Sequence, residues 1–227
     1  MSTDTRNRLL EGTIDALRAH GIAGVSARTI AAAAGVNQAL IFYHFGSVDD
    51  LLAAATMRST LEQVALYREQ FAQVRSLREL QNVGREVRER ERAAGHVAIL
   101  GQLLAGAQTN PVYATATRDA LQLWIVEIED VLDRVLSDSV LADVADVPGL
   151  ARALSASFIG MELMAVVDPD GDALAAAALD QLGMLAERLD ELGPVTQRAL
   201  RGAVRRTARK GRSASETPGR GGKPTEA

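Results

Sequence analysis

The sequence contains no cysteine, so no disulfide and no thiolate-based metal or catalytic site can form. Aromatic residues make up only 4% of the chain, and no long run of uncharged apolar residues occurs, which argues against a membrane span. Charges are spread through the N-terminal segment, unlike the apolar core of a signal peptide. We therefore expect a cytoplasmic protein with no membrane partner, whose 227 residues, 47% of them hydrophobic, bury a sizeable core.

Motifs of catalysis and cofactor binding are also lacking. The three histidines, His20, His44 and His96, are scattered along the chain without the spacing of metal ligands. There is no G-x-S-x-G elbow, P-loop or dinucleotide fingerprint. We therefore expect no enzyme, no catalytic residue, and no metal or cofactor site.

The pattern along the chain predicts an all-α fold. Only six prolines occur, alanine and leucine are abundant, and no alternating β-branched strands are seen. A strong turn signal, Asp168-Pro169-Asp170-Gly171, separates the last two helices, and 138–148 is expected to be a loop. The expected helices are 4–20, 47–74, 77–109 with a break near Ala94-Gly95, 111–136, 149–167 and 173–192.

Three helix starts and two helix stops are crowded into the segment that begins near residue 21. Ser26, Asn37 and Ser47 are good N-cap residues, because their side-chain oxygens can accept from free amides of a first helical turn. Gly35 and Gly46 fall where the preceding helices must end. This spacing predicts a helix-turn-helix followed at once by another helix. Helices this short bury little of themselves, so one of them is free to enter a DNA major groove.

The expected recognition helix covers residues 38–44. Gln38 can pair with adenine, Ala39, Leu40 and Phe42 can touch thymine methyl groups, and Arg28 can reach guanine or a phosphate. The alternative is that these are ordinary surface residues of a small helical domain. The full set of DNA-binding candidates is Arg28, Thr29, Gln38, Ala39, Leu40, Phe42, Tyr43, His44 and Ser47.

From Leu9 to near Thr56 the chain resembles the TetR family of bacterial transcriptional repressors, whose motif runs roughly T-x-R-x-I-A-x-x-A-G-V-S-x-x-x-L-Y-x-H-F-x-S-K-x-x-L. Two positions depart from that motif: Phe42 stands in place of tyrosine and Val48 in place of lysine. The residues in register with the motif are Arg28, Ile30, Ala31, Ala34, Gly35, Val36, His44, Phe45, Ser47 and Leu51.

The resemblance implies a repressor that binds a palindromic operator in double-stranded DNA as a homodimer. In the family, the last two helices pair with a twofold partner, and here both are apolar on more than one face. A wholly internal core is the alternative. The dimerisation candidates are Leu154, Phe158, Ala178, Leu182, Leu185 and Leu189.

The resemblance also implies a small-molecule effector bound among the middle helices. Because aromatic residues are few, we expect an aliphatic pocket for an apolar effector rather than a flat aromatic cage. For Trp124, the single tryptophan, a core role is the alternative and the more common one. The candidates are His96, Gln102, Tyr113, Trp124, Phe158, Met161 and Glu162.

We expect three domains: a helix-turn-helix domain, 1–56, an effector-binding and dimerisation domain, 57–197, and a basic tail, 198–227. Net charge differs between these parts of the chain. Residues 1–58 are neutral, residues 59–197 carry a net charge of −11, and the remainder carries +7. A neutral DNA-binding domain predicts a shallow salt dependence of binding. The tail is expected to be disordered, with a non-specific DNA or RNA tether as the alternative.

One rival to the repressor stays open. Phe42, Val48 and the neutral charge of the first domain are compatible with a helical dimer that has lost operator binding and serves as a ligand-binding or scaffold protein. Activation in place of repression is equally open.

Overall fold

The computed structural model describes residues 2–137, 139, 141–142, 145–190, 192, 196, 199 and 202. This part of the chain is all-α, as predicted, and contains no helix long and apolar enough to cross a membrane. The expected tail, 198–227, lies outside the described residues except for Ala199 and Gly202. The helices are α1 (Ser2–Gly24), α2 (Ala27–Ala34), α3 (Ala39–Phe45), α4 (Val48–Gln73), α5 (Leu77–Ala93), α6 (His96–Gly106), α7 (Pro111–Leu136), α8 (Val147–Met164) and α9 (Pro169–Asp190).

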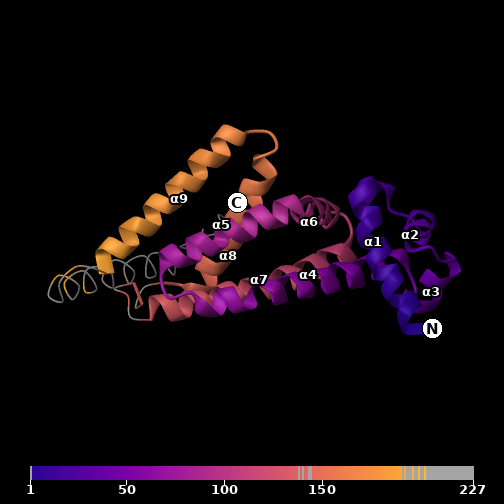
Figure 1. Cartoon of the computed structure of the whole chain (residues 1–227), viewed down its shortest axis with the longest axis horizontal. Coiled ribbons are helices and arrows are strands. Elements are labelled where there is room, and N and C mark those ends of the chain that lie inside the picture. Colours follow the sequence, from indigo (N-terminus) through magenta and orange to yellow (C-terminus); the bar gives the residue numbers. More distant parts are fainter. Residues whose placement is uncertain are drawn as a thin grey trace, which may run out of the picture.

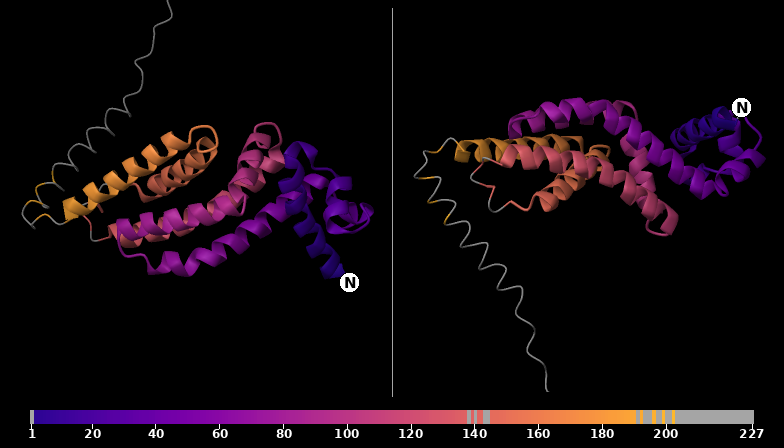
Figure 2. Two further views of the ribbon diagram at one scale, coloured as in Figure 1. Left: turned by 45° about the horizontal axis from the view of Figure 1, so that its top comes forward. Right: turned by 90° about the horizontal axis from the view of Figure 1, so that it is seen from below.

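The molecule is elongated, with helices α1–α3 and the start of α4 forming a head at one end and the remaining helices forming a body (Figure 1). Helices α4 and α7 lie side by side and run in the same direction from the head. Near their starts Tyr113 donates to Asp49, and near their ends Arg134 donates to the carbonyl of Phe71. Helices α8 and α9 form a hairpin beside them (Figure 2).

The helix starts follow the predicted caps at two of three positions. Ser26 and Ser47 each accept a hydrogen bond from the amide three residues ahead, at 3.2 and 3.0 Å. Asn37 differs, because its side chain accepts from Ala39, only two residues on, at 2.8 Å. That short-range bond forms a turn before the helix, so α3 begins at Ala39 with Gln38 as its N-cap residue.

The predicted stops and the predicted break are confirmed. Gly35 ends α2 in the left-handed conformation (φ 62°, ψ 40°), and Gly46 follows the end of α3. Gly95 is also left-handed (φ 73°) and divides the expected 77–109 helix into α5 and α6. A side chain at either left-handed glycine would be strained.

The last two helices begin earlier than predicted. Asp168 accepts from the amide of Gly171 at 3.0 Å, and Pro169 is the first residue of α9. Proline is favoured at a first helical position, because it has no amide hydrogen to leave unpaired. Half of the predicted turn is therefore the first turn of α9, and the connection itself lies at 165–168.

The head has its own core, in which the hydroxyl of the buried Thr13 donates to the carbonyl of Leu9 at 2.7 Å and the residues of the main cluster are apolar. These residues are Leu9, Leu10, Ala16, Ile30, Ala31, Ala34, Ile41, Leu51 and Ala55. A second cluster joins head and body, since Leu17 of α1 and Leu52 of α4 pack with Ile99 and Leu103 of α6. The head is thus a compact unit seated on the body through apolar contacts.

Candidate DNA-binding surface and ligand cavity

Helix α3 is anchored by one residue and presents the others outward. Ile41 is fully buried in the head core, whereas Phe42 and Tyr43 are 52% and 80% exposed. Large aromatic side chains are rarely this exposed on a small domain without a partner. The α3 surface therefore has the form expected of a recognition helix.

The nine DNA-binding candidates divide by exposure. Leu40 packs against the head core, so it does not face outward as predicted. His44 is half-buried and lies edge-on to the ring of Tyr43. The exposed candidates are Arg28, Gln38, Ala39, Phe42 and Tyr43, and the half-buried ones are Thr29, Leu40, His44 and Ser47.

Thr29 and Ser47 use their hydroxyl groups to build helix starts. Thr29 accepts from the amide of Ser26 at 2.9 Å, which completes a capping box at the start of α2. Ser47 donates to the carboxylate of Asp50 at 2.6 Å at the start of α4. The first-turn amides of such helices favour a phosphate group, so these residues support a backbone contact rather than base recognition.

Two arginines that the sequence analysis did not single out hold the helix-turn-helix to α1. Arg8 donates to the carbonyls of Ala34 and Gly35 at 2.8 and 2.7 Å, at the C-terminal end of α2. Arg6 lies over the ring of Phe45, 5.0 Å from its centroid. In the sequence, these two arginines are simply polar residues of the first helix. Their contacts depend on how α1 crosses α2 and α3, which the sequence pattern does not give.

Three of the seven effector candidates connect the body to the head. Arg18 of α1 donates to Nε2 of His96 at 2.9 Å, and Gln102 accepts from the amide of Ile22 at 2.6 Å. The Tyr113 hydroxyl donates to the Asp49 carboxylate at 2.7 Å. Burial and this bond to Asp49 raise the pKa of Tyr113 to about 12.

A cavity of about 500 Å³ lies in the body between α4, α5, α6, α7, α8 and α9. This volume suits a drug-sized ligand. Its wall is mostly apolar and contains four of the effector candidates: His96, Trp124, Phe158 and Met161. Trp124 also packs against Tyr67 and Phe71, with ring centroids 5.8 and 6.4 Å apart, so it is both a core residue and a wall residue. The predicted aliphatic character of the pocket holds for most of this wall.

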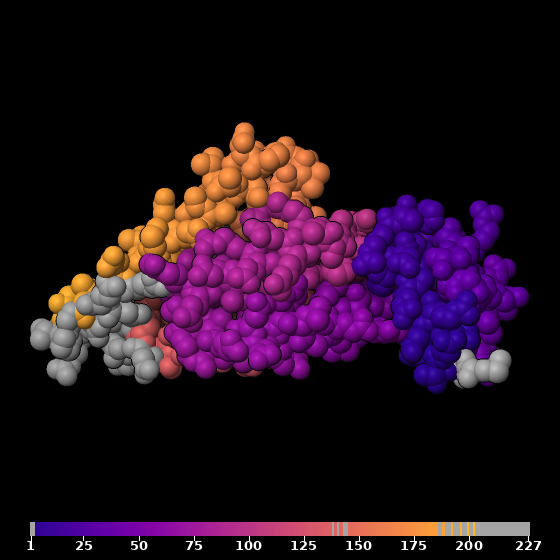
Figure 3. All heavy atoms as spheres, in the orientation of Figure 1, coloured from indigo at the N-terminus to yellow at the C-terminus, as the bar shows by residue number. Residues whose placement is uncertain are grey.

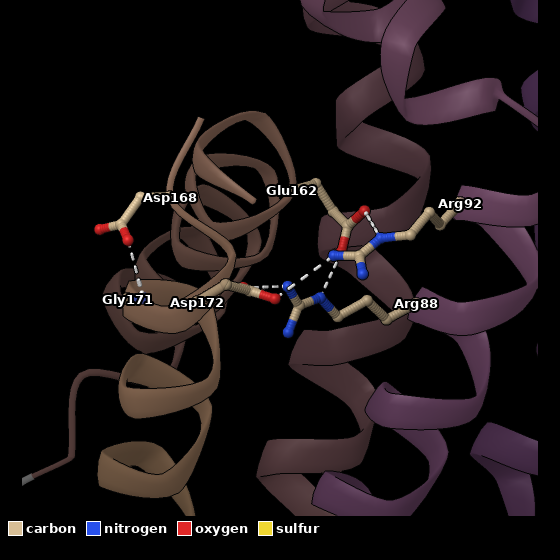
Figure 4. A network of polar contacts seen from close by, with 6 residues as sticks. All are labelled: Arg88, Arg92, Glu162, Asp168, Gly171 and Asp172. Carbon is tan, nitrogen blue, oxygen red and sulfur yellow. Dashed lines mark hydrogen bonds and ion pairs between the residues drawn. The ribbon is translucent and has the colours of Figure 1, made fainter. Parts of the chain in front are cut away.

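Glu162, the remaining effector candidate, belongs to an ion-pair network that ties α5 to α8 and α9. Its side chain is 2% exposed and accepts two bonds of 2.9 Å from Arg92 as well as one from Arg88 (Figure 4). Both arginines also pair with Asp172 of α9. Burial alone would raise the pKa of Asp172, but Arg88 and Arg92 hold it below its usual value.

The dimerisation candidates lie on the α8–α9 hairpin, which projects from one side of the body (Figure 3). Leu154, Leu182 and Leu185 are 36%, 62% and 62% exposed, and Ala178 is exposed as well, although Leu154 and Leu182 also border the cavity. Phe158 instead points inward, where it packs in the cluster that contains Tyr67 and lines the cavity. Its surroundings thus favour the effector role over the dimer role. The side chain of Leu189 lies outside the described residues.

Comparisons with known proteins agree with the geometry of the head. Residues 9–55 match the family described as bacterial regulatory proteins, tetR family. An uncharacterised HTH-type transcriptional regulator of Mycobacterium tuberculosis is 26% identical over 127 residues, which are 56% of this chain. The chain spans 65% of the length of that relative.

Solved structures share the fold beyond the head. A candidate transcriptional regulator from Streptomyces coelicolor superposes with a TM-score of 0.62 and 27% identity, covering 79% of this chain and 98% of that one. A TetR transcription regulator from Haloarcula marismortui superposes with a TM-score of 0.65 and 18% identity, covering 81% and 98%. The head of this chain therefore matches the DNA-binding domain of the tetR family, and about four fifths of the chain shares the fold of these solved regulators.

Proposed function

We propose that this protein is a repressor that binds a palindromic operator as a homodimer and is released by a small-molecule effector. The observation that carries the proposal is the pairing of an outward-facing α3 helix, with Phe42 and Tyr43 exposed, with a separate cavity in the body. Repression follows from occluding RNA polymerase at the operator. The proposed place of action is the cytoplasm, where the DNA lies.

The proposed homodimer forms through the α8–α9 hairpin. Three leucines of the hairpin are exposed to water in a single chain: Leu154 on α8, and Leu182 and Leu185 on α9. We propose that they form part of the apolar surface that the second copy covers. A twofold axis through this surface would present two α3 helices. Their half-sites on DNA would then lie one or two helical turns apart, at roughly 34–36 Å per turn.

The proposed release passes through α4. The boundary between the proposed 1–56 and 57–197 domains falls inside this helix, and its start is held to α7 by Asp49 and Tyr113. An effector that favours a different arrangement of the cavity wall would move α4 and change the spacing of the recognition helices. The proposed 198–227 tail takes no part in this step.

Footprinting upstream of the gene for this protein and its neighbours tests operator binding directly. Tyr43→Ala and Arg28→Ala should each abolish the specific gel shift while the far-ultraviolet circular dichroism stays unchanged. Leu66→Ala is the matched control, because Leu66 is 74% exposed on the body and lies outside the head. Footprints that persist in both head variants would refute the assignment of the recognition surface. A protein that shows no sequence preference at all would instead be a helical dimer that has lost operator binding.

A further inference from the structure

The cavity contains one buried carboxylate, Glu91 of α5. This residue is only 6% exposed and lines the cavity. One of its oxygens accepts from the Tyr67 hydroxyl at 2.8 Å, and the other accepts from Nδ1 of His96 at 2.8 Å. Burial, followed by this bond to Glu91, raises the pKa of Tyr67 to about 12, so the hydroxyl stays a donor.

His96 is a neutral partner of Glu91. Its Nε2 lies 2.9 Å from the Arg18 guanidinium, which can only donate hydrogen bonds. Nε2 is therefore the acceptor, and the single ring proton is on Nδ1, where it faces Glu91. Within the described part of the chain, no arginine pairs with the Glu91 carboxylate, whose two oxygens are met by the Tyr67 hydroxyl and the His96 ring.

The other charged groups of the cavity wall already have partners of opposite charge. Arg85 pairs with Asp180 at 2.6 Å, and Arg88 pairs with Glu162 and Asp172. Among the described residues, Glu91 is thus the carboxylate of the wall that has no arginine partner. A buried charge without a counter-ion is costly, and a cationic ligand would offset that cost.

One face of α4 adds hydrogen-bond acceptors to the same cavity. Thr56, Ser59, Thr60 and Gln63 line it at helical spacing, and Tyr67 continues the face one turn further. Thr56 is only 7% exposed, and its hydroxyl has no hydrogen-bond partner among the described residues. A primary ammonium group has three N–H donors, enough for a carboxylate and two hydroxyl oxygens.

We propose that the cavity takes a lipophilic primary amine, with its ammonium group on Glu91 and its hydrocarbon part along the apolar wall. The proposal rests on the proposed function, because it names the chemical class of the effector. Trp124 and Phe71 lie in the same wall, and the Trp124 ring contacts both Phe71 and the Tyr67 ring that donates to Glu91, so aromatic faces stand near the charge. An ammonium on Glu91 also competes with His96, which is the residue that holds Arg18 of the head.

The experiment uses the full chain and three probes of equal length: dodecylamine, dodecanol and dodecanoate, all below their micellar concentrations. Trp124 is the single tryptophan and lines the cavity, so its fluorescence reports binding directly. Dodecylamine should bind at least about tenfold more tightly than dodecanol, the effect of one charge-assisted hydrogen bond. Dodecanoate should bind most weakly of the three.

Glu91→Gln should reduce the preference for the amine over the alcohol to within about twofold, while the affinity for dodecanol stays the same. The unchanged dodecanol affinity shows that the variant keeps its fold and its cavity. Glu89→Gln is the matched control, because Glu89 lies on the same helix but is exposed to solvent, and it should keep the full preference.

Three results would overturn the proposal: dodecanoate binding as tightly as the amine, an amine preference that survives in Glu91→Gln, or no saturable binding of any probe. None of these measurements involves DNA. The proposed operator binding is tested separately by the ligand-free footprint, so the failure of one proposal is distinguishable from the failure of the other.

Discussion

The head and the body bury their side chains in different ways. The residues of the head cluster are apolar and at most 7% exposed, and the buried Thr13 hydroxyl beside them is paired with the carbonyl of Leu9. The body instead buries two carboxylates, Glu91 and Glu162, and contains a partly open cavity of about 500 Å³. A close-packed apolar core has few alternative arrangements, whereas a cavity with polar walls has several. The head is therefore suited to presenting one fixed surface and the body to changing its shape.

Two kinds of contact join the head to the body. One apolar patch lies at the centre, and a few hydrogen bonds surround it. Arg18 and Gln102 each take part in one hydrogen bond between α1 and α6, and Asp49 accepts from both Asn110 and Tyr113 at the start of α7. Such bonds contribute about 1 kcal/mol each, far less than a packed interface. A moderate change in the body can thus shift the head as a rigid unit without unfolding it.

The largest expected effect is on the unfolding free energy, when one isoleucine is changed to alanine in each region. Ile41→Ala in the head should cost about 2–5 kcal/mol of unfolding free energy, because Ile41 is fully buried in close-packed surroundings. Ile128→Ala should cost less than half of that, because Ile128 is half-buried and already faces the cavity. Urea denaturation followed by circular dichroism measures both values, with Leu66→Ala as the exposed control. Equal costs would contradict the contrast between a packed head and a hollow body.

A smaller effect is expected at the ion-pair network of the body. Glu162→Gln removes the negative charge that Arg88 and Arg92 share, and should cost about 2 kcal/mol. Glu129→Gln is the control, because its pair with Arg152 is exposed to solvent and should contribute less than about 1 kcal/mol. Hydrogen exchange should quicken in α8 and α9 only. Faster exchange in the head would show that the two regions are not separate.

The parts of this molecule that the sequence predicted are those governed by local chemistry. The caps at Ser26 and Ser47 and the stops at Gly35 and Gly95 depend on residues within one helical turn, and the structure agrees at each. Asn37 shows the limit of this reasoning, since its oxygen had two amides within reach and bonds the nearer one. The head was therefore predictable almost residue by residue.

The body was predictable only as helices, because its polar residues are defined by what other helices bring to them. His96, Gln102 and Tyr113 were chosen as polar groups in apolar helices, yet their partners come from α1 and α4. Glu91 belongs to a stretch of alternating charge, residues 85–92, of the kind typical of a solvated helix face, but the crossing of α4 places Tyr67 against it. No spacing within α5 distinguishes Glu91 from its exposed neighbour Glu89.

The smallest expected effect concerns the bond between Tyr113 and Asp49 and appears at alkaline pH. The pKa of Tyr113 is raised to about 12 in the folded protein, above the ordinary value of 10.0, so folding favours the neutral phenol. Its contribution to stability is complete below pH 10 and is lost as the pH rises through 12. Tyr113→Phe should therefore lower stability by about 1 kcal/mol at pH 8 and flatten the decline above pH 10. Thermal melts across this range measure the slope, and Tyr67→Phe serves as the comparison within the body, since the pKa of Tyr67 is raised to about 12 as well. If Tyr113→Phe left the alkaline slope unchanged while Tyr67→Phe flattened it, the bond between Tyr113 and Asp49 would carry no stability. The head would then be held to the body by the apolar contacts of Leu17 and Leu52 together with the bonds of Arg18 and Gln102.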